Sequence, residues 1–391
     1  MEKEKKIAIV GLGYVGLPLA IAFADKYKVL GFDINTQRID ELKKCFDKTK
    51  EVEPSKFNTA YPLKFTDSLD DLQSSNIFII TVPTPIDNNK QPDLSFLLSA
   101  SSKIGSILKK GDIVIYESTV YPGCTEEECV PVLEQKSGLF YNNDFFVGYS
   151  PERINPGDKT RPIQSIVKVT SGSTPEIAEV VDKLYKTVII AGTYKAPSIK
   201  VAEAAKAIEN AQRDVNISFM NELALIFDKL NIDIDEVLEA AKTKWNFLPF
   251  KPGLVGGHCI GVDPHYLAYR AMQVGYTPKV ILSGREVNEQ MGVWRAEKII
   301  AELAKKFNGN ICGKKVLILG FAFKENCTDT RNTKVVDVYN TLKKAGIEVS
   351  IYDPLVDAIN VEKEFGIELA QSKEGQFDYI FKAVSHSIFN D

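Results

Sequence analysis

Histidine is scarce in this chain, with three among 391 residues. The six cysteines are scattered and form no CxxC pair, so the spacing of a zinc ribbon is absent. His258, Cys259 and His265 do gather in GGHCIGVDPH, but without HExxH spacing. We therefore predict no metal site, and we expect free thiols, as in a reducing compartment.

An excess of basic residues is also lacking, because 48 Lys and Arg face 52 Asp and Glu, for a formal net charge of -4. No general basic field is present to attract nucleic acid or anionic lipid. No apolar run approaches the roughly 20 residues of a membrane helix. The start, MEKEKKIAIVGLGYVG, passes from a charged stub directly into a strand pattern. We therefore expect a cytoplasmic protein without nucleic-acid or membrane partners.

Short β-branched runs alternate with helix-length segments from residue 6 to about 190: KIAIVG, VLGFD, NIFIITV, DIVIYES, FFVGYS and IVKVTS. This rhythm predicts a parallel sheet with helices on both faces. The stretch from Pro197 to about Leu230 repeats apolar residues at three and four, which predicts one long helix. KKVLILGFAF and IEVSIYDP then begin a second βαβ unit.

The predicted fold is therefore α/β, with two Rossmann-like, doubly wound parallel sheets joined by a central helical domain. We place the domains at residues 1–196, 197–308 and 309–391. The length and apolar content of the helix from Pro197 to Leu230 predict a homodimer built along it.

The strongest local motif is GLGYVG, which follows a strand and opens a helix, with Asp33 closing the second strand. Glycines let the backbone approach a pyrophosphate at the helix N-terminus, and the acid accepts hydrogen bonds from the ribose hydroxyls. The motif predicts NAD as cofactor, because a carboxylate at Asp33 would repel the 2′-phosphate of NADP. The alternative is a tight turn followed by an acid that caps the next helix.

Three further segments follow strands: TVPTP (81–85), ESTVYP (117–122) and SPER (150–153). The carboxyl ends of the strands form the ligand crevice of a doubly wound sheet. Each segment alone is more typical of a Pro-containing turn. Their shared position favours contact with cofactor and substrate.

Two further patterns point to catalysis. Cys259 lies in a Gly/Pro-rich loop of about twenty residues, and such loops are usually functional. A lone cysteine is more often a small buried hydrophobe. Lys206 and Asn210 lie at i and i+4 on the long helix, in alanine-rich surroundings that favour a buried lysine over a solvated pair.

Together these segments resemble the UDP-glucose/GDP-mannose dehydrogenase family over nearly the whole chain. The resemblance rests on GLGYVGLPLA, TVPTP, ESTVYPG, SPERINPG, AKAIEN, GGHCIGVDPHYL and GFAFKENCTDTR, in family order. The sequence around the cysteine is most similar to that of UDP-N-acetylhexosamine 6-dehydrogenases of bacterial surface-polysaccharide pathways. The resemblance implies an NAD-binding domain, a central dimerisation and catalytic domain, and a UDP-sugar-binding domain abbreviated at its C-terminus.

The resemblance also implies a four-electron oxidation of a sugar C6 alcohol to a carboxylate, with two NAD and one water. The residues implied in catalysis are Cys259, Lys206, Asn210, Asp263, Glu152 and Thr119. Cys259 would form a thiohemiacetal and then a thioester, and Glu152 would activate the hydrolytic water. Lys206 and Asn210 would stabilise the oxyanion. Asp263 would organise Lys206 and a water near Thr119.

Binding residues are implied in the same way. Those for the cofactor are Gly11, Gly13, Tyr14, Val15, Gly16, Asp33, Arg38, Thr84, Ser118, Thr119 and Arg331. Those for the UDP-sugar are Glu152, Arg153, Ile154, Asn155, Lys206, Asn210, Lys251, Gly253, Gly256, Gly257, Phe323 and Lys324.

Several alternatives stay open. UDP-glucose, UDP-N-acetylmannosamine or GDP-mannose could replace the UDP-N-acetylhexosamine as substrate. A two-electron hydroxyacid dehydrogenase would also join a Rossmann domain to a long helix, but it would not need Cys259. A non-catalytic sugar-nucleotide-binding protein would tolerate loss of Lys206, Cys259 or Asp263, and all three residues are present.

Overall fold

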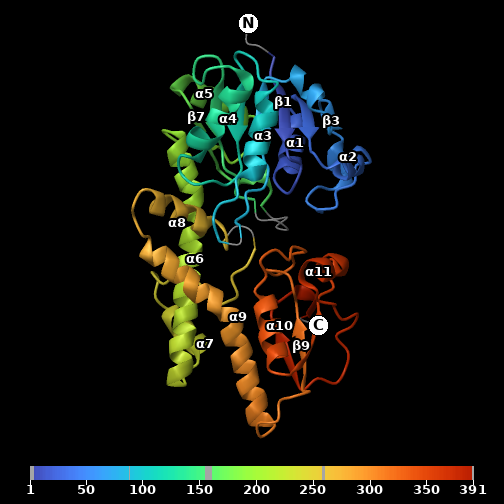
Figure 1. Ribbon diagram of the computed structural model, residues 1–391, viewed down its shortest axis with the longest axis vertical. Coiled ribbons are helices and arrows are strands. Elements are labelled where there is room, and N and C mark those ends of the chain that lie inside the picture. Colours follow the sequence, from blue (N-terminus) through green and yellow to red (C-terminus); the bar gives the residue numbers. More distant parts are fainter. Residues whose placement is uncertain (1–3, 88, 155–160, 258–259, 390–391) are drawn as a thin grey trace. The chain divides into compact units, whose positions relative to one another are not determined.

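The computed structural model describes residues 4–87, 89–154, 161–257 and 260–389. The chain forms two compact units (Figure 1). Unit 1 comprises Met1–Ile208 and His265–Arg270, and unit 2 comprises Glu209–Pro264 and Ala271–Asp391. Each unit carries its own sheet of mainly parallel strands, as the predicted fold class requires.

The sheet of unit 1 has the strand order β3-β2-β1-β4-β5-β6-β7-β8. In chain order the strands are β1 (Lys6–Val10), β2 (Lys28–Phe32), β3 (Leu63–Thr66), β4 (Ile77–Ile80), β5 (Ile113–Tyr116), β6 (Phe146–Tyr149), β7 (Lys168–Gly172) and β8 (Thr193–Lys195). The first six strands follow the 3-2-1-4-5-6 order of dinucleotide-binding sheets. The order reverses between β1 and β4, which places the ligand crevice at their carboxyl ends.

Two strands depart from the predicted parallel arrangement, because β7 pairs antiparallel with β6 and β8 runs parallel to β7. A parallel pair needs a crossover of a dozen or more residues, usually a helix. The described part of the β6–β7 connection contains only the 3-10 turn Ile163–Ser165. The next connection contains helix α5, and β7 and β8 are accordingly parallel.

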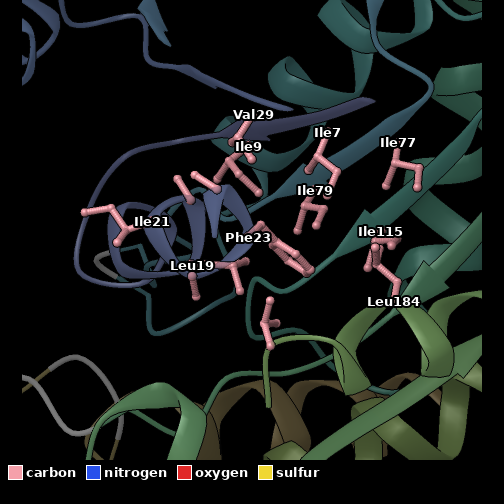
Figure 2. Close-up of a cluster of buried hydrophobic side chains, with 14 of the residues drawn as sticks. Ile7, Ile9, Leu19, Ile21, Phe23, Val29, Ile77, Ile79, Ile115 and Leu184 are labelled. Atoms are coloured by element: carbon pink, nitrogen blue, oxygen red, sulfur yellow. The ribbon is translucent and has the colours of Figure 1, made fainter. Parts of the chain in front are cut away.

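Both faces of this sheet are covered. Its helices are α1 (Gly16–Ala24), α2 (Thr36–Lys43), α3 (Ser95–Gly105), α4 (Val130–Ser137) and α5 (Pro175–Lys186), with a π-helical turn at Thr125–Cys129 and 3-10 turns at Pro54–Phe57 and Leu69–Ser74. Figure 2 shows one face, where isoleucines of β1, β4 and β5 lie near Phe23 of α1 and Leu184 of α5. On the other face, the hydroxyls of Ser101 and Tyr116 lie 2.8 Å apart and join α3 to β5. Burial on both faces explains why the strands have continuous apolar runs.

The predicted long helix is α6 (Ile199–Leu230), which starts in unit 1 and continues in unit 2. Two further helices follow, α8 (Asp263–Gln273) and α9 (Lys279–Lys306). Gly275, with φ +83°, and Pro278 separate these two helices.

Unit 2 contains a smaller parallel sheet in the order β10-β9-β11. Its remaining elements are α7 (Ile234–Ala241), β9 (Lys315–Leu319), α10 (Val335–Lys344), β10 (Glu348–Tyr352), α11 (Ala358–Phe365), β11 (Tyr379–Lys382) and a 3-10 turn at Ser387–Phe389. Residues of α9, β9 and α10, including Ile299, Val316 and Val338, share one buried core. The sheet therefore resembles half of a Rossmann fold.

Candidate active site

The glycine turn after β1 has the geometry of a pyrophosphate cradle. Gly11 has φ +95°, a conformation that favours glycine. A Cβ on Gly16 would lie 1.8 Å from the carbonyl oxygen of Gly11, so only glycine lets α1 begin this close to the turn. A Cβ on Gly13 would meet no heavy atom within 4 Å, which leaves open space above the turn. These features fit an NAD pyrophosphate at the N-terminus of α1.

Asp33 is held where a ribose-binding acid belongs. Its carboxylate accepts hydrogen bonds from the backbone N–H of Leu12 at 2.8 Å and of Asn35 at 2.9 Å. The residue stays half-buried rather than enclosed. Its charge therefore remains next to the open side of the turn, as NAD selectivity requires.

Arg38, a predicted cofactor residue, lies buried against the glycine turn. Its Nε donates to the carbonyl oxygen of Leu12 at 3.0 Å, and its Nη2 lies 2.8 Å from Asp47. Burial raises the pKa of Asp47, but hydrogen bonds from Thr49 and Arg38 outweigh it and leave that pKa below its usual value. Arg38 thus supports the turn with its charge compensated.

The loops after β4 and β5 are fastened to each other at the sheet edge. Thr84 donates to the carbonyl oxygen of Thr119 at 2.7 Å, and Ser118 donates to that of Val82 at 2.6 Å. Thr81 donates to the carbonyl oxygen of Gly11 at 2.7 Å. The structure therefore brings together the predicted residues Thr84, Ser118 and Thr119 beside the glycine turn.

Glu203 is a residue of this region that the sequence patterns missed. Its carboxylate accepts hydrogen bonds from the backbone N–H of Gly123 at 2.5 Å and of Thr125 at 2.9 Å. Burial raises the pKa of Glu203 to about 7. Glu203 fastens the segment after ESTVYP to α6, one turn before the buried Lys206. The sequence offered one sign of this role, because Glu203 precedes Lys206 by three residues on an apolar helix and so lies on the same face.

Glu152 lies in a buried charged cluster. Its Oε2 is 2.5 Å from Nζ of Lys168, which is also 2.7 Å from Glu117. Tyr185 donates a hydrogen bond to Glu117 from α5. Glu117 opens the predicted segment ESTVYP, but sequence patterns did not single out Lys168 or Tyr185, because they come from separate segments. Arg153 and Ile154 lie half-buried beside Glu152, while Asn155 lies outside the described residues.

In unit 2, Asn210 and Asp263 form a buried pair. The Asn210 amide donates to a carboxylate oxygen of Asp263 at 2.5 Å. Asn210 is fully buried and Asp263 is 2% exposed. Two predicted catalytic residues are therefore adjacent, whereas Cys259 lies outside the described residues.

The predicted glycine loop packs against the GFAFK segment and residues 331–332. A Cβ on Gly257 would lie 2.7 Å from the Phe323 ring, and one on Gly256 would lie 2.7 Å from the carbonyl oxygen of Asn332. The N–H of Gly257 donates to the carbonyl oxygen of Arg331 at 3.0 Å. The loop, Phe323 and Arg331 therefore form one region of unit 2.

The remaining predicted side chains of this region are charged. Lys324 Nζ lies 5.5 Å from the centroid of the Phe323 ring, and Lys251 is exposed. The Arg331 guanidinium forms an ion pair with Asp329 at 2.5 Å. Lys251 and Lys324 thus supply positive charge of the kind that a diphosphate needs.

Another missed residue, Asn221 of α6, holds the start of the glycine loop. Its side-chain oxygen accepts from the Gly253 N–H at 2.8 Å, and its amide donates to the Gly253 carbonyl at 3.0 Å. The amide also donates to Asn288 at 2.8 Å, and Asn288 donates to Asp214 at 2.7 Å. A buried polar chain therefore links Gly253 to α6 and α9.

Asp353, the acid at the end of the second strand of the second βαβ unit, is too buried to bind a ribose. Asp353 has a side chain with 0% exposure, and it accepts from Phe321 N–H at 2.7 Å, Ala322 N–H at 3.0 Å and the His386 ring at 3.0 Å. Burial raises the pKa of Asp353, but these hydrogen bonds hold it below its usual value. This half-Rossmann unit therefore lacks the open acid that Asp33 provides in unit 1.

The described residues contain no group of three or more His, Cys, Asp or Glu side chains arranged to hold a metal ion. Among the described helices, none is both long and apolar enough to span a membrane.

The chain has the parts of an NAD-dependent dehydrogenase. Its first sheet has the strand order, glycine turn and acid of a dinucleotide-binding domain. A long helix with buried Lys206 and Asn210 and a second Rossmann-like sheet follow. The chain belongs to the UDP-glucose/GDP-mannose dehydrogenase family. Models of the family match its NAD binding domain at residues 5–189, its central domain at 200–290 and its UDP binding domain at 317–391.

Individual relatives cover the whole chain. It is 57% identical over 390 residues to a UDP-N-acetyl-D-glucosamine 6-dehydrogenase of Pseudomonas aeruginosa, covering 100% of this chain and 92% of that one. It is 56% identical to an enzyme of the same name from Salmonella typhi, covering 99% and 91%. A solved UDP-D-ManNAc dehydrogenase from Pyrococcus horikoshii has a TM-score of 0.88 at 32% identity, covering 98% and 90%. The predicted family, α/β fold and NAD-dependent oxidoreductase class are confirmed.

Proposed function

We propose that this enzyme oxidises the C6 alcohol of UDP-N-acetylglucosamine to the carboxylate. The observation that carries the proposal is the identity of 57% and 56% to two enzymes of that name over nearly the whole chain. The P. horikoshii enzyme acts on a different N-acetylhexosamine and is only 32% identical. The described residues supply the groups that the chemistry needs.

NAD would be held by the glycine turn, with Gly11, Gly13, Tyr14, Val15 and Gly16 around the pyrophosphate and Asp33 at the ribose. When bound, NAD accepts one hydride in each of the two oxidation steps. We infer that Thr84, Ser118 and Thr119 line the cofactor, because their loops are fastened beside the turn. Arg38 acts by supporting the turn, and the family resemblance also assigns Arg331 to the cofactor.

In the first oxidation, a water held by Thr119, Lys206 and Asp263 takes the proton of the C6 hydroxyl. The Cys259 thiolate then adds to the aldehyde carbon, and the second oxidation converts the thiohemiacetal into a thioester. Water activated by Glu152 releases the uronate. A thiolate suits this sequence because it adds readily to a carbonyl and leaves readily from an acyl group.

Lys206 and Asn210 stabilise the oxyanion of the tetrahedral species. Lys206 is 4% exposed, so its charge acts in surroundings where electrostatic interactions are stronger than in water. One Asn210 N–H is bonded to Asp263, which fixes the orientation of the amide and leaves a second N–H as a donor.

The UDP-sugar would be bound by Lys251, Gly253, Gly256, Gly257, Phe323 and Lys324, with Glu152, Arg153, Ile154 and Asn155 at the sugar. Residues 1–196, 197–308 and 309–391 would serve as the cofactor, central and UDP-sugar domains. The lysines supply charge for the diphosphate, and the glycines let the backbone approach it. The packing of Gly257 against Phe323 supports one continuous binding surface for this part of the substrate.

The enzyme would act as a cytoplasmic homodimer. Five apolar side chains of α6 are each more than 40% exposed: Val201, Ile208, Phe219, Ile226 and Leu230. Their spacings of 7, 11, 7 and 4 residues place them on one face of the helix. A two-fold axis would pair this stripe with its copy. The free cysteines among the described residues suit a reducing compartment.

The deciding experiment measures NADH formed per UDP-N-acetylglucosamine consumed, for wild type and Cys259→Ala. UDP-N-acetylgalactosamine, UDP-N-acetylmannosamine and UDP-glucose serve as competing substrates. We expect two NADH per sugar, abolished in the variant, and the highest kcat/KM for UDP-N-acetylglucosamine. One NADH per sugar, or a better competitor, would refute the proposal. Sedimentation at micromolar concentration tests the dimer, with Phe219→Glu as the disrupting variant.

A further inference from the structure

We propose that Lys168 is a positioning residue for Glu152, which it holds in the orientation needed to activate the hydrolytic water. Lys168 opens β7, whereas Glu152 follows β6. The inference rests on the hydrolytic function proposed for Glu152. Lys168 itself need not touch the substrate.

The contacts of Glu152 fix its carboxylate from two sides. Oε2 lies 2.5 Å from Nζ of Lys168, and Oε1 accepts from the Arg153 N–H at 2.6 Å. A carboxylate has about four lone-pair sites, so these two contacts leave others for a water. The arrangement orients the base without saturating it.

Lys168 is held just as firmly. Its side chain is 3% exposed, and its second partner is Glu117 at 2.7 Å, directly after β5. Glu117 is bonded in turn to Tyr185 on α5, and Nζ of Lys168 lies 5.3 Å from the Tyr185 ring centroid. Three strand ends and a helix therefore fix the position of Nζ.

Simple charge compensation does not explain why one lysine contacts two acids. If both acids are ionised, the buried cluster carries a net negative charge, which is costly. Burial raises the pKa of Glu117 above its usual value, with the negative charge of Glu152 adding to the effect. Glu117 has the Tyr185 hydroxyl as a second donor, whereas Lys168 is the side-chain donor to Glu152 in the described contacts.

The step that depends on this orientation is thioester hydrolysis. The water oxygen bonds to the acyl carbon while one water proton passes to Glu152. The C–S bond then breaks, its electron pair stays on the Cys259 sulfur, and that sulfur recovers the proton from Glu152. The uronic acid loses its own proton to solvent. A carboxylate misplaced by about 1 Å would slow this step roughly 100-fold.

The test is Lys168→Met in the full-length enzyme, followed by rapid-mixing absorbance for NADH and intact-protein mass spectrometry for the covalent acyl adduct. We expect a burst of two NADH per active site at close to the wild-type rate, then turnover slowed about 100-fold with the adduct accumulating. Glu152→Gln is the benchmark, because losing the base itself should give the same adduct.

Tyr185→Phe is the matched control, since it removes a hydrogen bond from the same buried cluster and leaves the Lys168–Glu152 contact in place. It should not accumulate the adduct. If Lys168→Met does not fold, Lys168→Met/Glu117→Gln removes the second acid and tests the same contact. Equal slowing of the NADH burst and of hydrolysis, or normal turnover, in a folded variant would overturn the inference. Failure of the proposed function would appear separately, as one NADH per sugar in the wild-type enzyme.

Discussion

Replacing Asn221 with alanine should loosen the UDP-sugar loop without touching the cofactor site. The Asn221 side chain makes three hydrogen bonds: two to the backbone of Gly253, at 2.8 and 3.0 Å, and one to Asn288 at 2.8 Å. Alanine would remove all three from a position with 0% exposure. The loop would then keep its contacts at Gly257 but lose its attachment at Gly253.

The size of the effect follows from the groups left without partners. A buried polar group that loses its partner costs about 1–3 kcal/mol. Gly253 is exposed, so water can replace part of what is lost there, whereas the oxygen of Asn288 lies in the interior. We therefore expect Asn221→Ala to lower the free energy of unfolding by about 2–4 kcal/mol. If binding the UDP-sugar must supply about 1.4 kcal/mol to order the loosened loop, the KM for the UDP-sugar would rise roughly tenfold.

The assay is steady-state kinetics with each substrate varied in turn, together with urea unfolding followed by circular dichroism. The KM for NAD should stay unchanged, because the glycine turn belongs to unit 1. Asn216→Ala on the same helix is the control, since its amide donates to the Gln212 carbonyl in an exposed hydrogen bond. A loss of stability below about 1 kcal/mol, the lower bound for a buried group that loses its partner, or equal rises in both KM values, would refute the reasoning.

Further predictions concern unit 1. Because burial raises the pKa of Glu203 from 4.5 to about 7, the folded protein binds the extra proton, and stability should fall by up to about 3 kcal/mol as pH rises through that window. Glu203→Gln should lack this pH dependence. If the free energy of unfolding changed equally in the two proteins between pH 5 and 8, the prediction would be wrong. Gly16→Ala should abolish NAD binding in titration calorimetry, because its Cβ would lie 1.8 Å from the Gly11 carbonyl oxygen; retained affinity would contradict the close approach. Asp33→Asn should raise the kcat/KM ratio of NADP to NAD about tenfold or more by removing a like-charge contact, and an unchanged ratio would show that other groups set the preference.

The sequence by itself determined the family, the class of fold and most strands of unit 1. Continuous apolar runs such as IFII and IVIY predicted a sheet covered on both faces, and β4 and β5 are completely buried. GLGYVG and Asp33 predicted a cofactor cradle, because glycine geometry and acid spacing are local properties. The helix from Ile199 to Leu230 was equally clear from its periodicity.

Short edge strands and the strand direction at β7 were not determined in this way. LKFT and TYK, which form β3 and β8, are too short and too polar to show a period. The direction of β7 depends on how the chain returns to the sheet, which no residue pattern in IVKVTS records.

Tertiary structure alone decided which side chains support the site. Lys168, Glu117 and Tyr185 lie up to 68 residues apart in the chain, yet they meet behind Glu152 because β5, β6 and β7 are neighbours in the sheet. Asn221 reaches Gly253 across 32 residues. The reacting groups of such a site must have particular chemistry, so they leave motifs. The residues that hold them need only a donor or a charge at the right place, and folding is what creates that place.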